Sequence, residues 1–429
     1  MIDIELLRKN PEEVIKRLGT RGVSKEDVEK LIQADASWRE SKTAYERLEA
    51  QRNELMQERS LPLPEDEEKR LTAMIEEITK QLRDSKEWEN LKSLKENRDR
   101  LWKYLPNLPL PDVPVGSDVS ANQEITGLSR PHPKFDFPPL DHVELGGRLN
   151  LLDVERATTA SGSRFGALIG NGVRLELALV NHALDTLVNE GFQPVMPPTL
   201  IRRDRMEAMG YLDRGAEEVY TTQDDLVLVG TSEQSVGAMY AGQVFSQKDL
   251  PARFAAFSAC FRREAGSHGK DVRGIIRVHQ FDKVEMFSFC RPEDSVKEHS
   301  FFLELQKRLM EDLEIPFRVV QLCTGDLGFA AAATYDIEAW FPSRNAFVET
   351  HSTSNTTDFQ TRRLPVKFRA GNGPLRLGHA VNGTAYAIPR TIAALLEAHQ
   401  TADGTVRIPN VLRPYLGGQD TLRRPDERR

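Results

Sequence analysis

Charged side chains recur at alternate positions through the segment Phe261–Phe287, which reads FRREAGSHGKDVRGIIRVHQFDKVEMF. The residues AAFSACFRRE alternate as a β-strand does, which places Arg262 and Glu264 on one face. A second strand is expected over Ile276–Phe287, and these charged residues share one of its sides: Arg277, His279, Lys283 and Glu285. An arginine fixed on a strand suits a phosphate, because its planar fork donates two parallel hydrogen bonds. The pattern is equally typical of an ordinary hairpin with solvated charges.

The polar loop AGSHGKDVRG joins these two expected strands. Its glycines, at positions 266, 269 and 274, allow a wide and mobile turn. Four basic side chains in or beside the loop are expected to close over a polyanion: Arg263, His268, Lys270 and Arg273.

Hydroxyl and carboxylate groups follow a second apolar strand, LVLVG, at Thr231, Ser232 and Glu233. Such a cluster at a strand end can accept hydrogen bonds from an ammonium group, although Thr-Ser-Glu is also a helix-capping sequence. Near the C-terminus, a strand of small residues runs into Pro389 and Arg390 and then into an amphipathic helix. An arginine at a helix start lies where the helix dipole also favours a phosphate.

Oxygen ligands suited to a metal ion occur at Glu349 and Ser352, where the expected strands YDIEAWFP and AFVETHSTSN meet. Mg²⁺ prefers hard oxygen ligands of this kind and keeps waters and nucleotide phosphates beside them. A glutamate close to a serine is also a common surface pair. His351 has no serine or aspartate partners at the spacing of a catalytic triad.

The first 104 residues are charged, poor in glycine and helical in pattern. Apolar residues recur at helical spacing on both sides of the break SLPLPEDEE: Trp38, Tyr45, Leu48 and Leu55 before it, and Leu71, Met74, Ile75, Ile78 and Leu82 after it. Two helices of about thirty residues joined by a short turn predict an antiparallel coiled-coil hairpin that projects about 45–50 Å.

Basic residues are spread along this expected arm: Arg39, Lys42, Arg47, Arg52, Arg59, Lys69, Arg70, Lys80, Arg83 and Lys86. An arm of this kind buries little beyond its own seam, so reach toward a partner is one interpretation. A solvated face paired with neighbouring glutamates is a second interpretation, and a dimerising coiled coil is a third.

After a proline-rich linker, PNLPLPDVPVG, strands and helices mix without a regular βαβ order. No GxGxxG or P-loop motif follows a strand, so we expect an α+β fold with an antiparallel sheet. The helix VRLELALVNHALDTLVNE, residues 173–190, is apolar on nearly every face. Such a helix is buried either in a core or against another subunit.

Composition limits the classes of protein that this chain can belong to. It has 429 residues, 39% of them hydrophobic, so it can bury a full core. Its net charge of -7 does not indicate a polyanion partner at the level of the whole chain. No apolar run has membrane-spanning length. Cys260, Cys290 and Cys323 lack metal-ligand spacing and are expected to be buried packing residues in a reducing cytoplasm.

The segment Phe261–Phe287 strongly resembles motif 2 of class II aminoacyl-tRNA synthetases, in the form found in seryl-tRNA synthetases. Other matches extend the resemblance from Met1 to about Gly418: the opening MIDIELLRKNPEEVIKRL, the helical arm, TASGSRF, a motif 1-like helix and strand, TSE, ETHS, a motif 3-like HAVNGTAYAIPR, and the closing DGTVRIPNVLRPYLGG.

The resemblance implies a serine–tRNA ligase that forms seryl-adenylate from L-serine and ATP and then charges the 3′ adenosine of tRNA(Ser) for protein synthesis. It leaves undecided whether tRNA(Sec) is also charged. It further implies Mg²⁺, a cytoplasmic homodimer, and no membrane or DNA partner. The implied domains are a tRNA-binding arm (1–105), a linker (106–120), a class II catalytic domain with an antiparallel sheet flanked by helices (121–418), and a polar tail (419–429).

The resemblance also implies a role for each site residue. The catalytic residues would be Arg262 and Arg390, and the metal ligands Glu349 and Ser352. ATP would be bound by Arg262, Arg263, Glu264, Val278, Glu349, Thr350, His351, Ser352 and Arg390. Serine would be bound by Thr231, Ser232, Glu233, Arg262, Glu285, Asn382 and Thr384. The tRNA would be bound by Arg39, Lys42, Arg47, Arg52, Lys80 and Arg83.

Two positions depart from the family pattern. Ala333 stands where relatives generally carry a lysine or arginine, and Thr353 replaces a common cysteine. Two rival functions remain open at this point. One is a synthetase-like enzyme that activates an amino acid for a carrier protein or peptide, and the other is a non-enzymatic RNA-binding or scaffold protein. The complete arm disfavours the first rival, and the presence of Arg262, Glu285 and Arg390 disfavours the second.

Overall fold

The computed structural model describes residues 1–83, 86–265 and 273–424. They form two compact units, one of Ile2–Pro106 and the other of Met1 with the residues from Asn107 onward. His268 and Lys270, two of the basic residues predicted to close over a polyanion, lie outside the described residues.

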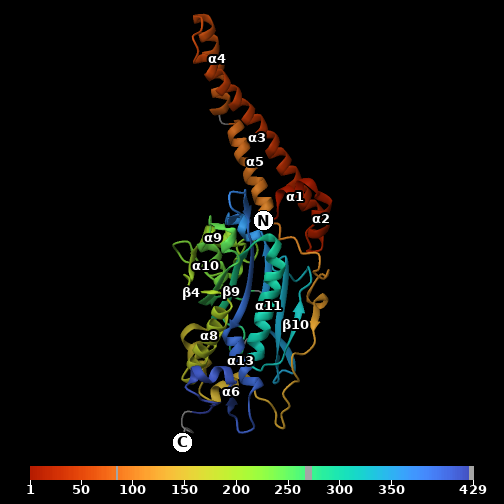
Figure 1. Cartoon of the computed structure of the whole chain (residues 1–429), viewed down its shortest axis with the longest axis vertical. Coiled ribbons are helices and arrows are strands. Elements are labelled where there is room, and N and C mark those ends of the chain that lie inside the picture. The colour runs from red at the N-terminus through yellow and green to blue at the C-terminus, as the bar shows by residue number, and fades with distance from the viewer. Residues whose placement is uncertain (84–85, 266–272, 425–429) are drawn as a thin grey trace. The chain divides into compact units, whose positions relative to one another are not determined.

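The smaller unit is helical, as the sequence predicts. Two short helices open it, α1 (Ile4–Lys9) and α2 (Pro11–Gly19). The long helix α3 (Lys25–Arg59) then packs along α4 (Glu65–Arg83) and α5 (Lys86–Lys103), and Figure 1 shows these helices as an extended hairpin. Acidic residues fill the first turn of α4, where they stabilise the positive end of the helix dipole.

The seam of this hairpin is made by the predicted apolar residues, with one exception. Leu55 packs with Leu71, Ile75, Ile78 and Leu82, and these side chains are buried. Met74 is exposed, because Leu71, Ile75, Ile78 and Leu82 already form a single stripe along α4 and Met74 lies outside that stripe.

The larger unit is built on an eight-stranded sheet, which confirms the expected antiparallel α+β architecture. Its strand order is β1 (Gln123–Thr126), β10 (Phe317–Gln321), β11 (Ala333–Phe341), β12 (Ala346–Thr357), β15 (His379–Ala387), β9 (Gln280–Cys290), β8 (Ala252–Phe261) and β4 (Gln193–Val195). Neighbouring strands are antiparallel except β4 and β8, which are parallel.

Three long helices cover one face of this sheet and bury the main core against it: α8 (Asn171–Asn189), α11 (Ser295–Asp312) and α13 (Ile388–Ala398). Val284 and Met286 of β9 point into that core. The alternate residue Phe287 points to the opposite face, where it packs with α9 (Arg203–Met209) and α10 (Ser232–Met239). The alternation of β9 predicted from the sequence is therefore confirmed.

Shorter elements complete the larger unit. The helices are α6 (His142–Arg148), α7 (Val154–Ser161) and α12 (Phe359–Arg363). Three small sheets have two strands each: β2 (Leu152–Asp153) with β3 (Ala167–Leu168), β5 (Leu200–Arg202) with β6 (Leu226–Leu228), and β16 (Val406–Arg407) with β17 (Thr421–Leu422). A fourth small sheet has three strands, with β13 (Lys367–Arg369) between β7 (Val244–Ser246) and β14 (Leu375–Leu377).

The hairpin predicted around Arg262 differs from the observed one at its ends. Strand β8 stops at Phe261 and β9 begins at Gln280, so Arg262, Glu264 and Arg277 lie beyond the strands rather than on them. Glu264 has a φ of 51°, which a strand does not accommodate. The two chain segments still pair just beyond the strand ends, because the Arg262 amide donates to the His279 carbonyl at 3.0 Å.

Helix α8 is less uniformly buried than its sequence predicts. Leu175, Leu179 and Leu187 are fully buried in the main core, whereas Leu177 and Val188 are 52% and 45% exposed. The helix therefore has a second apolar face that the described residues leave exposed.

Candidate active site

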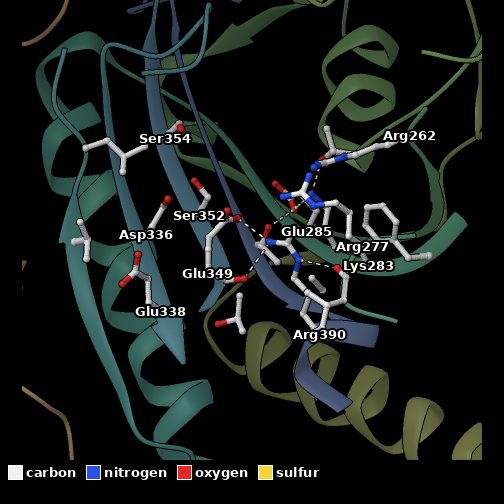
Figure 2. Close-up of a pocket in the computed structure, with 18 of the residues that line it drawn as sticks. Arg262, Arg277, Lys283, Glu285, Asp336, Glu338, Glu349, Ser352, Ser354 and Arg390 are labelled. Carbon is white, nitrogen blue, oxygen red and sulfur yellow. Dashed lines mark hydrogen bonds and ion pairs between the residues drawn. The ribbon is translucent and has the colours of Figure 1, made fainter. Parts of the chain in front are cut away.

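A pocket of about 860 Å³ opens on the face of the large sheet opposite the three long helices. Strands β9, β12 and β15 form its floor, and β10 and β11 extend it to one side. Figure 2 shows the charged side chains that converge in it. Most of the predicted ATP, serine and metal residues line this pocket: Thr231, Glu233, Arg262, Glu264, Val278, Glu285, Glu349, Thr350, Ser352, Asn382, Thr384 and Arg390.

Two arginines enter the pocket from the ends of secondary structure elements. Arg262 follows β8 directly, and its Nε donates to the Gly230 carbonyl at 3.2 Å. Arg390 lies in the first turn of α13, where its Nε donates to the Ile276 carbonyl at 3.2 Å and its Nη1 to Glu349 Oε1 at 2.9 Å. These contacts hold both guanidinium groups at the pocket wall, where they can donate paired hydrogen bonds to an anion.

A third guanidinium faces the same space. Arg277 Nη1 donates to Glu264 Oε2 at 2.5 Å, so these two side chains form an ion pair at the pocket wall. The ring of Phe281 lies 5.4 Å from the Arg262 guanidinium and gives the wall an apolar surface. A flat aromatic surface between cations is suited to a nucleotide base with its phosphates.

The deepest part of the pocket is small and polar. Lys283 Nζ lies 2.5 Å from Glu285 Oε2 and donates to Thr231 Oγ1 at 2.7 Å, and Thr384 Oγ1 donates to Glu285 at 3.2 Å. All four residues are buried. A buried cluster with alternating donors and acceptors can read a small substrate that carries both a hydroxyl and an ammonium group.

Glu233 adds a second carboxylate to this end of the pocket. The Tyr211 hydroxyl donates to Glu233 Oε1. Burial, together with the nearby charge of Glu285, raises the pKa of Glu233 to about 7. Burial also raises the pKa of the Tyr211 phenol well above its usual value, so this group remains a hydrogen-bond donor.

A β-bulge places Glu349 and Ser352 on the same face of β12. In the pairing of β11 with β12, Ile337 lies opposite His351 and the next residue, Glu338, lies opposite Glu349. Thr350 therefore has no residue opposite it on β11 and is the extra residue of the bulge. Side chains three positions apart would otherwise point to opposite faces of a strand. The bulge therefore brings two oxygen ligands together that regular alternation would separate.

A second bulge shapes the small, polar end of the pocket. In β15, Thr384 pairs with Glu285 and Tyr386 pairs with Val284, which makes Ala385 the extra residue. Thr384 consequently lines the pocket, whereas Tyr386 is buried in the core on the other face.

Carboxylates gather beside Glu349 on the neighbouring strand. Asp336 and Glu338 of β11 also line the pocket. Burial, and then the charge of Glu349, raises the pKa of Asp336 well above its usual value. At Glu349 burial acts in the same direction, but the charges of Arg390 and Arg262 outweigh it and lower the pKa. Glu349 is therefore ionised at neutral pH.

Among the described residues, no three histidine, cysteine, aspartate or glutamate side chains are grouped closely enough to hold a metal ion by themselves, so a cation here would also need oxygen atoms from a bound substrate. Oδ1 of Asp336 is buried and has no hydrogen-bond partner among the described residues. Glu349, Ser352 and Glu338 line the same pocket and carry hard oxygen atoms, the kind that Mg²⁺ prefers. Such a cation would satisfy this oxygen and reduce the repulsion between the carboxylates.

Three predicted site residues do not line the pocket. Ser232 is buried and its hydroxyl bonds that of Ser258 at 2.8 Å. His351 is buried, where burial lowers its pKa to about 4, and its ring bonds Thr350 Oγ1 at 2.8 Å. Arg263 is exposed, and its amide donates to the Glu218 carbonyl at 2.8 Å. The predicted ligand contacts of these three residues remain predictions.

The pocket residues that sequence reasoning did not assign include Tyr211, Phe281, Lys283 and Asp336. Lys283 lies two residues before Glu285, so alternation predicts that both side chains share one face of the strand, but it does not predict what Lys283 contacts. Tyr211 lies in an irregular segment after α9, and no local pattern points to it. Asp336 becomes conspicuous only because β11 pairs with β12.

Ala333 and Thr353, the two departures from the family pattern, are both buried. Ala333 packs with Val320 and Leu322 in an apolar cluster. Thr353 Oγ1 donates to the Asn382 carbonyl at 2.8 Å and so gains a partner for its hydroxyl. These surroundings explain why small or internally bonded side chains fit at both positions.

The predicted tRNA-binding residues belong to the smaller unit. Arg39, Lys42, Arg47, Lys80 and Arg83 are exposed, and Arg52 is half-buried. Arg39 Nε donates to the buried Asp35 at 2.9 Å, and Lys42 lies 3.4 Å from Glu46. Exposed cations along two antiparallel helices are compatible with a polyanion and also with a solvated surface.

Comparison with known proteins covers almost the whole chain. Residues 1–109 match the seryl-tRNA synthetase N-terminal domain, and residues 218–399 match the class II tRNA synthetase core domain (G, H, P, S and T). The chain is 42% identical over 419 residues to serine–tRNA ligase from Fervidobacterium nodosum, covering 97% of this chain and 98% of that protein. It is 44% identical over 431 residues to the enzyme of the same name from Streptomyces coelicolor, covering 98% and 99%.

A solved structure is similar over the same extent. Seryl-tRNA synthetase from Pyrococcus horikoshii, crystallised with ATP, superposes with a TM-score of 0.89 at 38% identity, covering 99% of this chain and 100% of that chain. In the part of the chain that the structure describes, no helix is long and apolar enough to cross a membrane. With two matched domains and full-length relatives of this identity, the chain belongs to the seryl-tRNA synthetase family of class II aminoacyl-tRNA synthetases.

Proposed function

We propose that the protein activates L-serine with ATP and transfers the seryl group to tRNA(Ser). The observation that carries this proposal is a single pocket that joins two arginines and a group of hard oxygen ligands to a small, buried, polar end. An ATP-sized anion and an amino acid as small as serine would lie side by side in such a pocket. Membership of the seryl-tRNA synthetase family supports the same reaction.

Adenylate formation requires a serine carboxylate oxygen to attack the α-phosphorus of ATP while pyrophosphate leaves. We assign Arg262 to the α-phosphate and the serine carboxylate, because it lines the same pocket as both the buried polar cluster and Arg390. We assign Arg390 to the γ-phosphate. The protein forms no covalent bond in this step, so its contribution is positioning and stabilisation of charge on phosphate oxygens.

The nucleotide base is assigned to the wall that carries Glu264, Val278 and Phe281. Glu264 also bonds Arg277, so binding of ATP would exchange an internal ion pair for contacts with the substrate. Thr350 lies on the same strand as the metal ligands, and its hydroxyl donates to the Ile337 carbonyl at 3.2 Å. It would therefore act by fixing the bulge.

Mg²⁺ would be held by Glu349 and Ser352, with Asp336 and Glu338 beside them. When bound, the cation would neutralise phosphate charge and orient the leaving pyrophosphate. Without it, Glu349 is paired with Arg390 through a 2.9 Å contact. Arg390 would then turn toward the γ-phosphate when the nucleotide arrives.

Serine would occupy the deep end of the pocket. We assign its ammonium group to Glu233 and Thr231, and its hydroxyl to Glu285 and Thr384. Asn382 would complete the wall. Alanine lacks the hydroxyl and would leave buried polar groups unpaired, which permits rejection by on the order of 10⁴-fold.

The arm, residues 1–105, is assigned to tRNA binding, with residues 106–120 as a connection, residues 121–418 as the catalytic domain and 419–429 as a tail. Exposed cations on the arm support contact with a phosphate backbone. A homodimer is proposed from exposed apolar side chains, which are Leu177 and Val188 of α8 and Met196 after β4, the last of them 79% exposed. Three buried free thiols suit a reducing cytoplasm.

Two assays test the function against its rivals. Serine-dependent pyrophosphate exchange measures adenylate formation, and charging of bulk tRNA then measures transfer. Exchange without charging would favour the rival enzyme that loads a carrier protein or peptide. Absence of both activities in a folded, ATP-competent preparation would favour a non-enzymatic RNA-binding protein. The same charging assay with tRNA(Sec) decides whether that tRNA is a second substrate.

A further inference from the structure

Lys283 is a buried cation at the floor of the amino-acid end of the pocket. Its side chain is 6% exposed and its Nζ contacts Glu285 at 2.5 Å and Thr231 at 2.7 Å. It projects from β9 two residues before Glu285, so both side chains share one face of the strand. The contact with Thr231, the N-cap residue of α10, connects the sheet to the segment that carries Glu233.

Burying an ammonium group is costly unless a carboxylate and further hydrogen bonds compensate it. A hydrophobic residue at position 283 would fill the same space without that cost, so the cation needs an explanation from the pocket itself. The pocket provides one, since Glu233 and Glu285 are two buried carboxylates that face the same small volume.

Lys283 provides one of two cations that lie near the two buried carboxyl groups of this region. Arg262 and Lys283 are the cations, and Glu233 and Glu285 are the carboxylates. Serine enters as a zwitterion and adds no net charge. If a neutral residue replaced Lys283, Glu285 would compete with Glu233 for the ammonium group of the substrate, although Glu285 is required for the hydroxyl.

We infer that Lys283 is a specificity-determining positioning residue: by neutralising Glu285, it directs the substrate ammonium group to Glu233 and reserves Glu285 with Thr384 for the hydroxyl. This inference rests on the proposed function, because it assigns the parts of serine to parts of the proposed pocket. It adds a selection mechanism to that function, since serine is distinguished from alanine only if Glu285 forms a hydrogen bond with the serine hydroxyl.

The competing explanation is that Lys283 merely holds β9 and α10 together. Both explanations predict lower stability when Lys283 is replaced. They differ in the preference for serine over alanine, because a purely structural contact would lower activity with both amino acids by the same factor.

The test measures kcat/KM for serine, alanine and threonine by pyrophosphate exchange in the full-length protein and in Lys283→Met. Methionine keeps the length of the side chain but removes its charge. We expect kcat/KM for serine to fall by about 100-fold, since breaking a buried ion pair leaves an uncompensated charge. We expect the serine-to-alanine ratio to fall by at least about tenfold, because hydroxyl reading is lost. The KM for ATP should change by less than about twofold, as at an independent site.

A double variant keeps the test valid if Lys283→Met folds poorly. Lys283→Met combined with Glu285→Gln removes both charges, and a neutral pair of similar volume is tolerated far better than a lone buried charge. The glutamine retains an amide that can bond a hydroxyl. We expect the double variant to recover at least about tenfold of the serine kcat/KM lost in Lys283→Met, a coupling that the double-mutant cycle measures directly.

Lys297→Met, on the exposed surface of α11, serves as the matched control and should leave all ratios unchanged. An unchanged serine-to-alanine ratio in Lys283→Met, or the absence of coupling with Glu285→Gln, would overturn the inference. Absence of serine-dependent exchange in the unmodified protein would instead overturn the proposed function, so the two failures are distinguishable.

Discussion

The helical arm and the pocket are both rich in charge, but they place their charges in different environments. On the arm, Lys69 and Glu65 form an ion pair with side chains 70% and 81% exposed. In the pocket, Lys283 and Glu285 form one with side chains 6% and 3% exposed. An exposed pair contributes about 0–1 kcal/mol to stability, whereas breaking a buried pair costs about 3–5 kcal/mol. The arm therefore tolerates substitution, and the pocket does not.

The base of the arm is an exception that explains how the arm keeps its shape. Asp35 is buried, Arg8 donates to it at 2.7 Å and 2.8 Å, and Arg39 at 2.9 Å. Burial disfavours the ionised form of Asp35, but the hydrogen bonds and charge of Arg8 outweigh it and lower the pKa. Arg98 also stacks over Trp38 at 3.7 Å. A helical arm whose base is held by such contacts, and whose remaining length is exposed, can present its cations to a partner.

The largest effect is expected from removing the distal arm. Replacing residues 46–87 by a short turn keeps the contact between Trp38 and Arg98 and therefore the base of the hairpin. We expect tRNA charging to be lost, and serine-dependent pyrophosphate exchange to stay within about twofold, because distant sites act independently. Measuring both activities on one preparation checks this. A parallel loss of exchange and charging would show that the arm and the pocket are not separate in function.

The next effect concerns the two pocket arginines. Arg262→Ala and Arg390→Ala should each lower pyrophosphate exchange by about 100-fold or more, because each removes donors aimed at phosphate oxygens. Lysine at either position should recover little activity, since a point charge cannot reproduce a bidentate fork. Arg156→Ala is the control, because that side chain is 89% exposed in its ion pair with Asp153. Near-full exchange activity in Arg390→Lys would contradict the bidentate role.

The same contrast explains what the sequence could and could not predict. Helical spacing identified the arm and most of its seam, because α3, α4 and α5 are stabilised by local patterns. Alternation identified the pocket-facing side of β9, because Glu285 and Val284 must lie on opposite faces of a strand. The resemblance to seryl-tRNA synthetases supplied the roles, which composition and spacing left open.

The parts that escaped prediction depend on contacts between distant segments. The bulges at Thr350 and Ala385 arise from the register with neighbouring strands, and no local sequence pattern specifies them. The contact of Lys283 with Thr231 joins residues 52 positions apart. The early end of β8 follows from the positive φ of Glu264, a conformation that its residue type does not favour.

A smaller effect is expected from pH, through a carboxyl group of the pocket. Burial and the charge of Glu285 raise the pKa of Glu233 to about 7, so this carboxyl is increasingly protonated as the pH falls below 7. Protonated Glu233 cannot attract an ammonium group. The KM for serine should therefore rise by about tenfold per pH unit below 7 and level off above it.

Exchange assays at saturating ATP between pH 5.5 and 8.5 measure this dependence. Glu233→Gln should raise the KM for serine at neutral pH and remove its slope, since glutamine does not titrate in this range. A slope that persists in Glu233→Gln would assign the titration to another group in the pocket.

The smallest effect is expected from single charges on the arm. Arg47→Glu and Lys80→Glu change exposed residues, so the free energy of unfolding should move by less than about 0.5 kcal/mol. If both residues contact phosphates, tRNA affinity should fall, and the slope of log K against log salt should decrease by about one for each lost contact. Filter binding at several salt concentrations measures the slope. Lys297→Glu, on α11 of the larger unit, introduces the same charge change outside the arm and should leave the slope unaltered. An unchanged slope in both arm variants would mean that these cations are solvated rather than bound to tRNA, and the arm would then recognise its partner through shape and through other residues.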